Sequence, residues 1–119
     1  MSSARFPRTH RLSGRAAFGR LFREGISLRS GWLSLQVFPN QLSRVRFGCT
    51  VRREAAPAGV FRSRLKRWLR EAFRRNQEIF PAGVDMVAVI WNKPADLSYQ
   101  EVERTFLDLS RRLAQALGG

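Results

Sequence analysis

The sequence predicts a single α+β domain that combines three helices with three strands. Three observations support this prediction. The chain has 119 residues, which is enough to bury a core but too few for two domains. Hydrophobic residues make up 44% of the chain and charged residues 26%, a balance typical of globular proteins. Apolar residues recur at helical spacing in three segments, and they alternate or run together in three others.

The N-terminal region is expected to form an arm followed by a helix. Residues 1–10 are polar and basic and show no periodicity, so we expect a loosely ordered arm. Ser13 is a candidate N-cap for a helix over residues 14–23. Phe18 and Phe22 lie on one side of this helix, where they are either ordinary core residues or one wall of a binding groove.

Two strands are expected next, over residues 32–38 and 44–52. In both, apolar residues alternate with polar ones, as in strands whose two faces meet different surroundings. The polar positions of the second strand include Arg44, Arg46 and Arg52, with no acid between them. We therefore expect one face that packs on the core and one basic face.

The basic face has two interpretations. An ordinary solvent-exposed face of an antiparallel pair is also polar. Arginines bordered by Phe18 and Phe22 would instead form a groove suited to single-stranded nucleic acid, in which phosphates meet guanidinium groups and bases stack on rings. The absence of acids from this strand favours the groove.

The segment FRSRLKRWLREAFRR, residues 61–75, predicts an amphipathic helix that continues to about residue 79. Its apolar stripe consists of Phe61, Leu65, Trp68, Leu69 and Ala72. The rest of its surface carries seven basic residues against one acid. Like charges at this spacing destabilise an isolated helix, so we favour contact with a polyanion over a face kept only for solubility.

The C-terminal third predicts one more strand and one more helix. Residues 84–91 are almost continuously apolar, which favours a central strand buried on both faces. Ser98 and Glu101 form a capping box at the start of a helix over residues 99–117. The apolar stripe of this helix is expected to cover the sheet.

The charge of the chain points to a phosphate-rich partner. The net charge is +13, from 22 basic and nine acidic residues. Anionic lipid attracts the same charge, but we find no apolar run of membrane-spanning length, signal peptide or lipidation motif, so we expect no membrane partner. Cys49 is the only cysteine, which excludes a disulfide framework, predicts a small buried side chain and fits the reducing cytoplasm.

No set of side chains predicts a complete active site. The acids are scattered, His10 is the only histidine, and there is no Gly-rich phosphate loop or paired-cysteine motif. We therefore expect no catalytic residue and no metal site in the polypeptide. If the protein belongs to an enzyme, the chemistry lies in its partner.

Four stretches resemble the protein component of bacterial ribonuclease P, over nearly the whole chain. They are HRLSGRAAFGRLFREG, RFGCTVRR, RSRLKRWLREAFR and DLSYQEVERTF. The third is similar to the family's Arg-Asn-Arg motif continuing as Lys-Arg-x-x-Arg-Glu, and the combination and order of the stretches are specific. The resemblance implies a two-layer α/β sandwich of αβββαβα type, a fold of the α+β class, with a left-handed crossover.

The resemblance also implies a function. The protein would be the non-catalytic subunit of an RNA-based endoribonuclease that removes the 5′ leader from precursor tRNA, with Mg²⁺ held mainly by RNA. The implied partners are the catalytic RNA subunit and precursor tRNA, in the cytoplasm and with no obligate protein partner. The whole chain, 1–119, would be one RNA-binding domain.

Two sets of site residues follow from the motif positions. The implied contacts to the catalytic RNA are Arg62, Ser63, Arg64, Lys66, Arg67, Arg70 and Arg74. The implied contacts to the leader are Phe18, Phe22, Arg46, Arg52 and Arg53.

The sequence departs from the family pattern at three places. Ser63 stands where the motif has Asn, and it lacks the paired donor and acceptor of an amide. Arg52 and Arg53 stand where paired lysines are usual, and the loop over residues 54–59 is shifted by one residue.

Other functions fit parts of the pattern. A ribosomal or other structural RNA-binding protein, with no catalytic assembly, would need the same charge. A sequence-specific DNA-binding protein also presents an arginine-rich helix, but the expected elements include no helix-turn-helix pair. A catalytic metalloprotein is the least favoured alternative, because the sequence lacks a set of metal ligands.

Overall fold

The computed structural model describes residues 25–80, 82–92 and 96–116. The expected arm at residues 1–10 and the helix expected over residues 14–23 lie outside these ranges, and so do Phe18 and Phe22. In chain order the described elements are β1 (Ile26–Ser30), β2 (Leu33–Pro39), β3 (Arg46–Val51), α2 (Gly59–Arg75), a 3-10 turn (Gln77–Ile79), β4 (Val84–Ile90) and α3 (Tyr99–Ala116).

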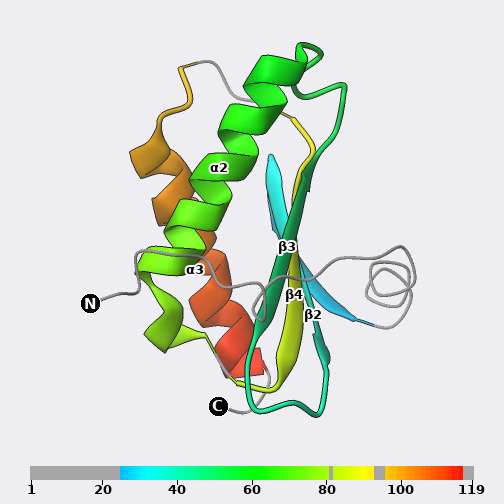
Figure 1. The fold of residues 1–119 in the computed structure, drawn as a ribbon, viewed down its shortest axis with the longest axis vertical. Coiled ribbons are helices and arrows are strands. Elements are labelled where there is room, and N and C mark those ends of the chain that lie inside the picture. The colour runs from blue at the N-terminus through cyan, green and yellow to red at the C-terminus, as the bar shows by residue number, and fades with distance from the viewer. Residues whose placement is uncertain (1–24, 81, 93–95, 117–119) are drawn as a thin grey trace.

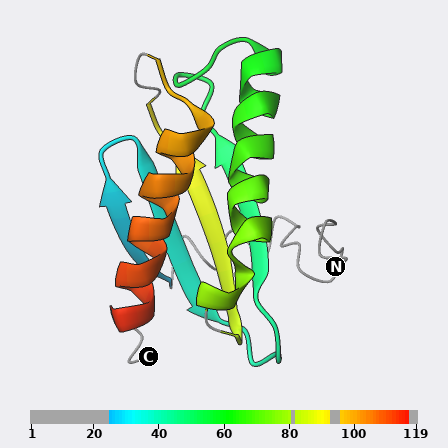
Figure 2. The same cartoon turned by 90° about the vertical axis from the view of Figure 1, so that its left-hand side faces the viewer.

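The described elements form two layers. One is a four-stranded sheet in the order β1-β2-β4-β3, in which β1 and β4 are antiparallel to β2 and β3 is parallel to β4. The other consists of α2 and α3, which lie on the same side of the sheet (Figure 1). Helix α2 packs against β3, and α3 packs against β1 and β2 (Figure 2). The α+β sandwich is confirmed for the described elements.

The connection from β3 through α2 to β4 is left-handed. In Figure 2 both strands point upward, α2 lies in front of them, and β4 lies to the left of β3. Parallel strands are joined by a right-handed crossover in about 98% of cases. The exception was expected from the family resemblance alone, because hydrophobic periodicity carries no information about handedness.

The core lies between the sheet and the helices. Each element contributes the side chains of one face or stripe, as its periodicity requires. Four phenylalanines meet at its centre, where Phe47 stacks on Phe73 with ring centroids 4.7 Å apart and Phe106 meets Phe47 edge-on at 5.6 Å. Phe80 packs against both Phe73 and Phe106. This aromatic cluster fixes α2 and α3 to the same part of the sheet.

Most element predictions are confirmed to within a few residues. The strands expected over residues 32–38, 44–52 and 84–91 correspond to β2, β3 and β4, and β4 is buried at all seven positions. Strand β1 was missed by pattern reading, because its sequence ISLRS has few apolar residues and an exposed or half-buried edge position. Strands β2 and β3 are consecutive in the chain, but β4 lies between them.

The apolar stripe predicted for the basic helix was partly wrong. Leu65, Leu69 and Ala72 are buried as expected, and Phe73 joins them. Phe61, near the start of α2, is 45% exposed and therefore lies at the surface rather than in the core. The helix ends at Arg75, where Asn76 leaves the helical conformation, rather than near residue 79.

Removing the central ring of α2 should be strongly destabilising. We expect Phe73→Ala to lower the free energy of unfolding by about 3–5 kcal/mol, because it leaves a cavity against Phe47 and Phe80. Phe61→Ala is the matched control in the same helix, and its exposed ring should change stability by only about 0.5 kcal/mol. Urea denaturation of both variants measures the difference, and equal losses would contradict the packing.

Cys49 should be unreactive while the protein is folded. The thiol is half-buried beneath α2, where S–H donates to the carbonyl oxygen of Lys66 at 3.8 Å. Burial raises its pKa from 9.0 to about 11, although the charges of Arg70 and Lys66 oppose the rise. The thiolate, which is the reactive form, is therefore about 100-fold scarcer at pH 8 than in the unfolded chain. Iodoacetamide should alkylate Cys49 far more slowly in buffer than in urea, and equal rates would refute this.

Candidate nucleic-acid interface

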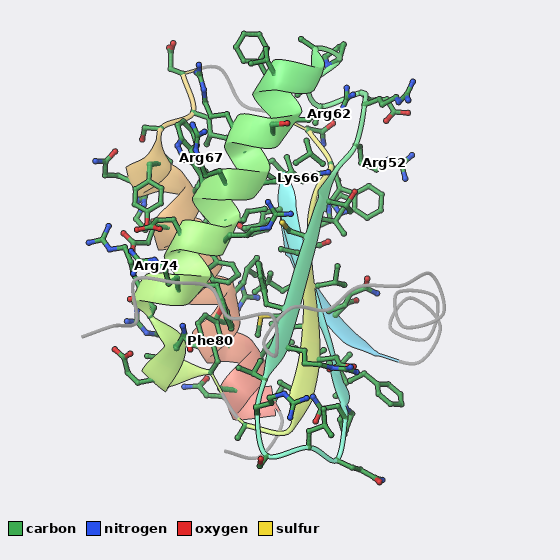
Figure 3. All side chains as sticks on the ribbon, in the orientation of Figure 1. Arg52, Arg62, Lys66, Arg67, Arg74 and Phe80 are labelled. Atoms are coloured by element: carbon green, nitrogen blue, oxygen red, sulfur yellow. The ribbon has the colours of Figure 1, made fainter. Side chains whose placement is uncertain are left out.

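The outward surface of α2 carries three cations that have no partner among the described residues. Lys66, Arg67 and Arg70 make no side-chain hydrogen bond or ion pair with any residue in the described ranges. Arg67 and Arg70 are exposed, and Lys66 is half-buried. Figure 3 shows Lys66 on the flank of α2 next to β3 and Arg67 on the flank farther from β3. We call these three residues the α2 cation face.

Two other predicted RNA contacts have structural partners. Arg62 donates from Nη1 to the carbonyl oxygens of Ala56 at 2.9 Å and Pro57 at 2.7 Å, so it holds the loop before α2. Arg74 pairs with Glu71, one turn earlier in the helix. The hydrogen bond from Arg74 lowers the pKa of Glu71 and raises that of Arg74. Both arginines therefore have fixed positions at the two ends of the α2 cation face.

The remaining members of this predicted set lie near the start of α2. Ser63 is exposed on the helix surface. The guanidinium of Arg64 lies 5.5 Å from the centroid of the Phe61 ring, a cation–π contact. The structure thus brings all seven predicted residues onto one helix, but only three of their charges are free of partners among the described residues.

No acid lies within β3, but one reaches its arginine from the neighbouring strand. Arg46 makes a bidentate pair with Asp85, in which Nε donates to Oδ1 at 2.7 Å and Nη2 to Oδ2 at 2.6 Å. Asn40 also donates to Asp85, at 2.9 Å. The two charges meet because Arg46 of β3 stands opposite Asp85 in the β4 ladder. The acid was missed because Asp85 lies in a segment that otherwise predicts a purely apolar strand.

Arg52 lies at the end of the same sheet face, beside an aromatic ring that the sequence did not single out. Its guanidinium is 5.2 Å from the ring centroid of Trp91, and Arg29 of β1 is 4.9 Å from the same ring. The indole N–H donates to Ser34 Oγ at 2.8 Å, which fixes its orientation. Residues two apart in a strand point the same way, so Trp91 faces the side of Asp85, away from the helices. The available signal was an aromatic residue at the end of the predicted strand over residues 84–91.

Arg52 and Arg53, which follow β3, differ in the charges around them. Arg52 lies 3.5 Å from a carboxylate oxygen of Glu54, in an exposed pair of the kind that contributes little to stability. Arg53 is exposed. The predicted aromatic wall of Phe18 and Phe22 lies outside the described residues, so the complete groove stays a prediction.

The described residues were compared with the requirements of a metal site and of a membrane span. They contain no group of three or more His, Cys, Asp or Glu side chains that could hold a metal ion. In the same ranges, no helix is long and apolar enough to cross a membrane. What they offer is two cationic surfaces, one on α2 and one at the Trp91 end of the sheet.

Comparison with known proteins places the chain in a family. A family model described as Ribonuclease P matches residues 6–114. The ribonuclease P protein component of Pelotomaculum thermopropionicum is 39% identical over 95 residues, which cover 80% of this chain and 84% of that protein. The component from Thermotoga maritima is 34% identical over 112 residues, covering 91% of this chain and 95% of that protein.

Solved structures agree with the sequence comparisons. The RNase P protein from Thermotoga maritima matches with a TM-score of 0.76 at 30% identity, over 86% of this chain and 96% of that one. The Staphylococcus aureus RNase P protein has the same fold, with a TM-score of 0.75 at 22% identity, over 88% of this chain and 94% of that one. Sequence and fold agree, and the chain belongs to the family of bacterial ribonuclease P protein components.

Proposed function

We propose that this protein is the protein subunit of ribonuclease P, which binds the catalytic RNA and the 5′ leader of precursor tRNA and assists removal of the leader. The observation that carries the proposal is the α2 cation face, in a chain of this family. Lys66, Arg67 and Arg70 repel one another in the isolated protein, and RNA phosphates would convert that repulsion into attraction.

The α2 cation face is the proposed contact to the catalytic RNA. Arginine presents a planar fork of donors that matches phosphate oxygens, which suits Arg67 and Arg70 to this contact. Arg62 and Arg74 have lost part of their donor capacity to the loop and to Glu71. They still add positive charge, and they hold the ends of the face in place. Ser63 and Arg64 complete the proposed set.

The opposite face of the sheet is the proposed contact to the leader. Arg52 and Arg53 supply cations there, and we add Arg29 and Trp91 to the proposed site because Trp91 lies against both Arg29 and Arg52. Arg46 keeps donors beyond the two that it gives to Asp85, so it remains a candidate. Phe18 and Phe22 belong to the proposal as stacking residues. The two RNAs would then meet opposite sides of one small domain.

The chemistry is assigned to the RNA partner. Mg²⁺ held mainly by the RNA would neutralise charge at the cleaved phosphate, and the described residues offer no ligand cluster that competes for it. The protein would act by screening phosphate repulsion between two RNA molecules, which is a task for cations alone. We propose that it does so in the cytoplasm, without an obligate protein partner or a membrane.

Reconstitution tests the function. Catalytic RNA with the protein should remove the leader from precursor tRNA at lower Mg²⁺ than the RNA alone, because the protein replaces some of the screening by Mg²⁺. Cleavage rates across a Mg²⁺ titration measure the effect. Leader removal by RNA-free protein would contradict the assignment of chemistry to RNA. An unchanged Mg²⁺ dependence would favour a structural RNA-binding protein with no role in cleavage.

The salt dependence of binding tests the α2 cation face. Arg67→Ala and Arg70→Ala should each weaken binding to the catalytic RNA and reduce the slope of log K against log salt by about 0.7–0.9 per lost phosphate contact. Arg112→Ala on α3 is the matched control, since its charge lies on another helix and pairs with Asp108. Its slope should equal that of the unmodified protein. Slopes unchanged in both α2 variants would remove this face from the interface.

A further inference from the structure

A small pocket lies on the flank of α2 that is turned away from β3. Its lining consists of Phe61, Arg64, Leu65 and Trp68 of α2 and Leu97 of the segment before α3. Its volume is 140 Å³. A cavity of about 150 Å³ accommodates one benzene ring, whereas sites for drug-sized molecules measure about 300–1,000 Å³. The pocket therefore has room for a single ring system.

The walls of the pocket combine one rigid ring with one accessible ring. Trp68 is half-buried and meets Tyr99 of α3 edge-on, with ring centroids 6.4 Å apart. Phe61 is 45% exposed. An exposed aromatic ring at the wall of a pocket is accessible to a ligand. Here the exposed ring offers a flat face for stacking.

The charge around the pocket favours an anionic occupant. Arg64 lines the pocket and lies against Phe61, and Arg67 follows one turn later on the α2 cation face. Asp96, next to Leu97 in the chain, is an exposed acid on this side. An aromatic face with arginines beside it matches a nucleotide, whose base stacks and whose phosphate binds guanidinium. An apolar peptide would leave these charges unused.

We propose that the pocket receives one unpaired nucleobase of the catalytic RNA, which stacks on Phe61 while Arg64 contacts its phosphate. This inference rests on the proposed function and extends it. The α2 cation face binds backbone phosphates of any sequence, whereas the pocket requires a base free of pairing. The protein thereby recognises an irregular feature of the RNA next to the phosphates that it neutralises.

Truncating the accessible ring tests the inference. Phe61→Ala should weaken binding to the catalytic RNA by about 5- to 150-fold, which corresponds to the loss of one base–aromatic stack. The salt slope should stay unchanged, because no phosphate contact is removed. Phe61→Tyr keeps a ring of the same shape and should bind within about twofold of the unmodified protein. Val60→Ala is the control, because it removes exposed apolar surface that does not line the pocket.

The outcomes separate this inference from the proposed function. If the unmodified protein shows no salt-dependent affinity for the catalytic RNA, the proposed function fails and the pocket inference fails with it. If Arg67→Ala flattens the salt slope but Phe61→Ala binds as tightly as the unmodified protein, only the pocket inference is overturned. It is also overturned if Phe61→Ala leaves RNA affinity intact but abolishes self-association in sedimentation, because the occupant is then a second copy.

Discussion

The stack of Phe47 on Phe73 is the contact on which the arrangement of this protein depends, because it holds a helix that is poorly stable by itself. Helix α2 carries seven basic residues and one acid, and each like-charge pair at helical spacing costs a few tenths of a kcal/mol. Burying a large apolar side chain contributes about 1.5–3 kcal/mol. Leu65, Leu69 and Phe73 are buried, so packing outweighs the repulsion. The charge can then remain concentrated on the outer face.

The left-handed crossover determines which cations share a side of the molecule. Because the crossover from β3 to β4 is left-handed, α2 lies on the same face of the sheet as α3. The Arg29, Trp91 and Arg52 cluster is left on the other face. The two cationic surfaces are consequently separated by the thickness of the domain. The two proposed RNA contacts would accordingly lie on opposite sides of the domain.

The sequence could predict the elements but not the pairing of charges. Periodicity located α2, α3 and three strands, because burial of one face leaves a regular apolar pattern. It could not locate the acid beside Arg46, since Asp85 is 39 residues away in the chain and the two meet only through strand order. Periodicity also could not predict the hydrogen bonds of Arg62, because its acceptors are backbone carbonyl oxygens, which every residue carries. Phe61 was wrongly assigned to the buried stripe, because an apolar pattern does not show where along a helix the burial ends.

The pair between Arg46 and Asp85 has a consequence for how the two parallel strands align. Strand β4 is buried on both faces, so its apolar side chains fit almost equally well after a slip of one residue. Such a slip would turn the Asp85 carboxylate toward the phenylalanine cluster and leave it without its guanidinium, at a cost of several kcal/mol. One acid in an otherwise uniform strand thus rules out misaligned versions of the sheet during folding.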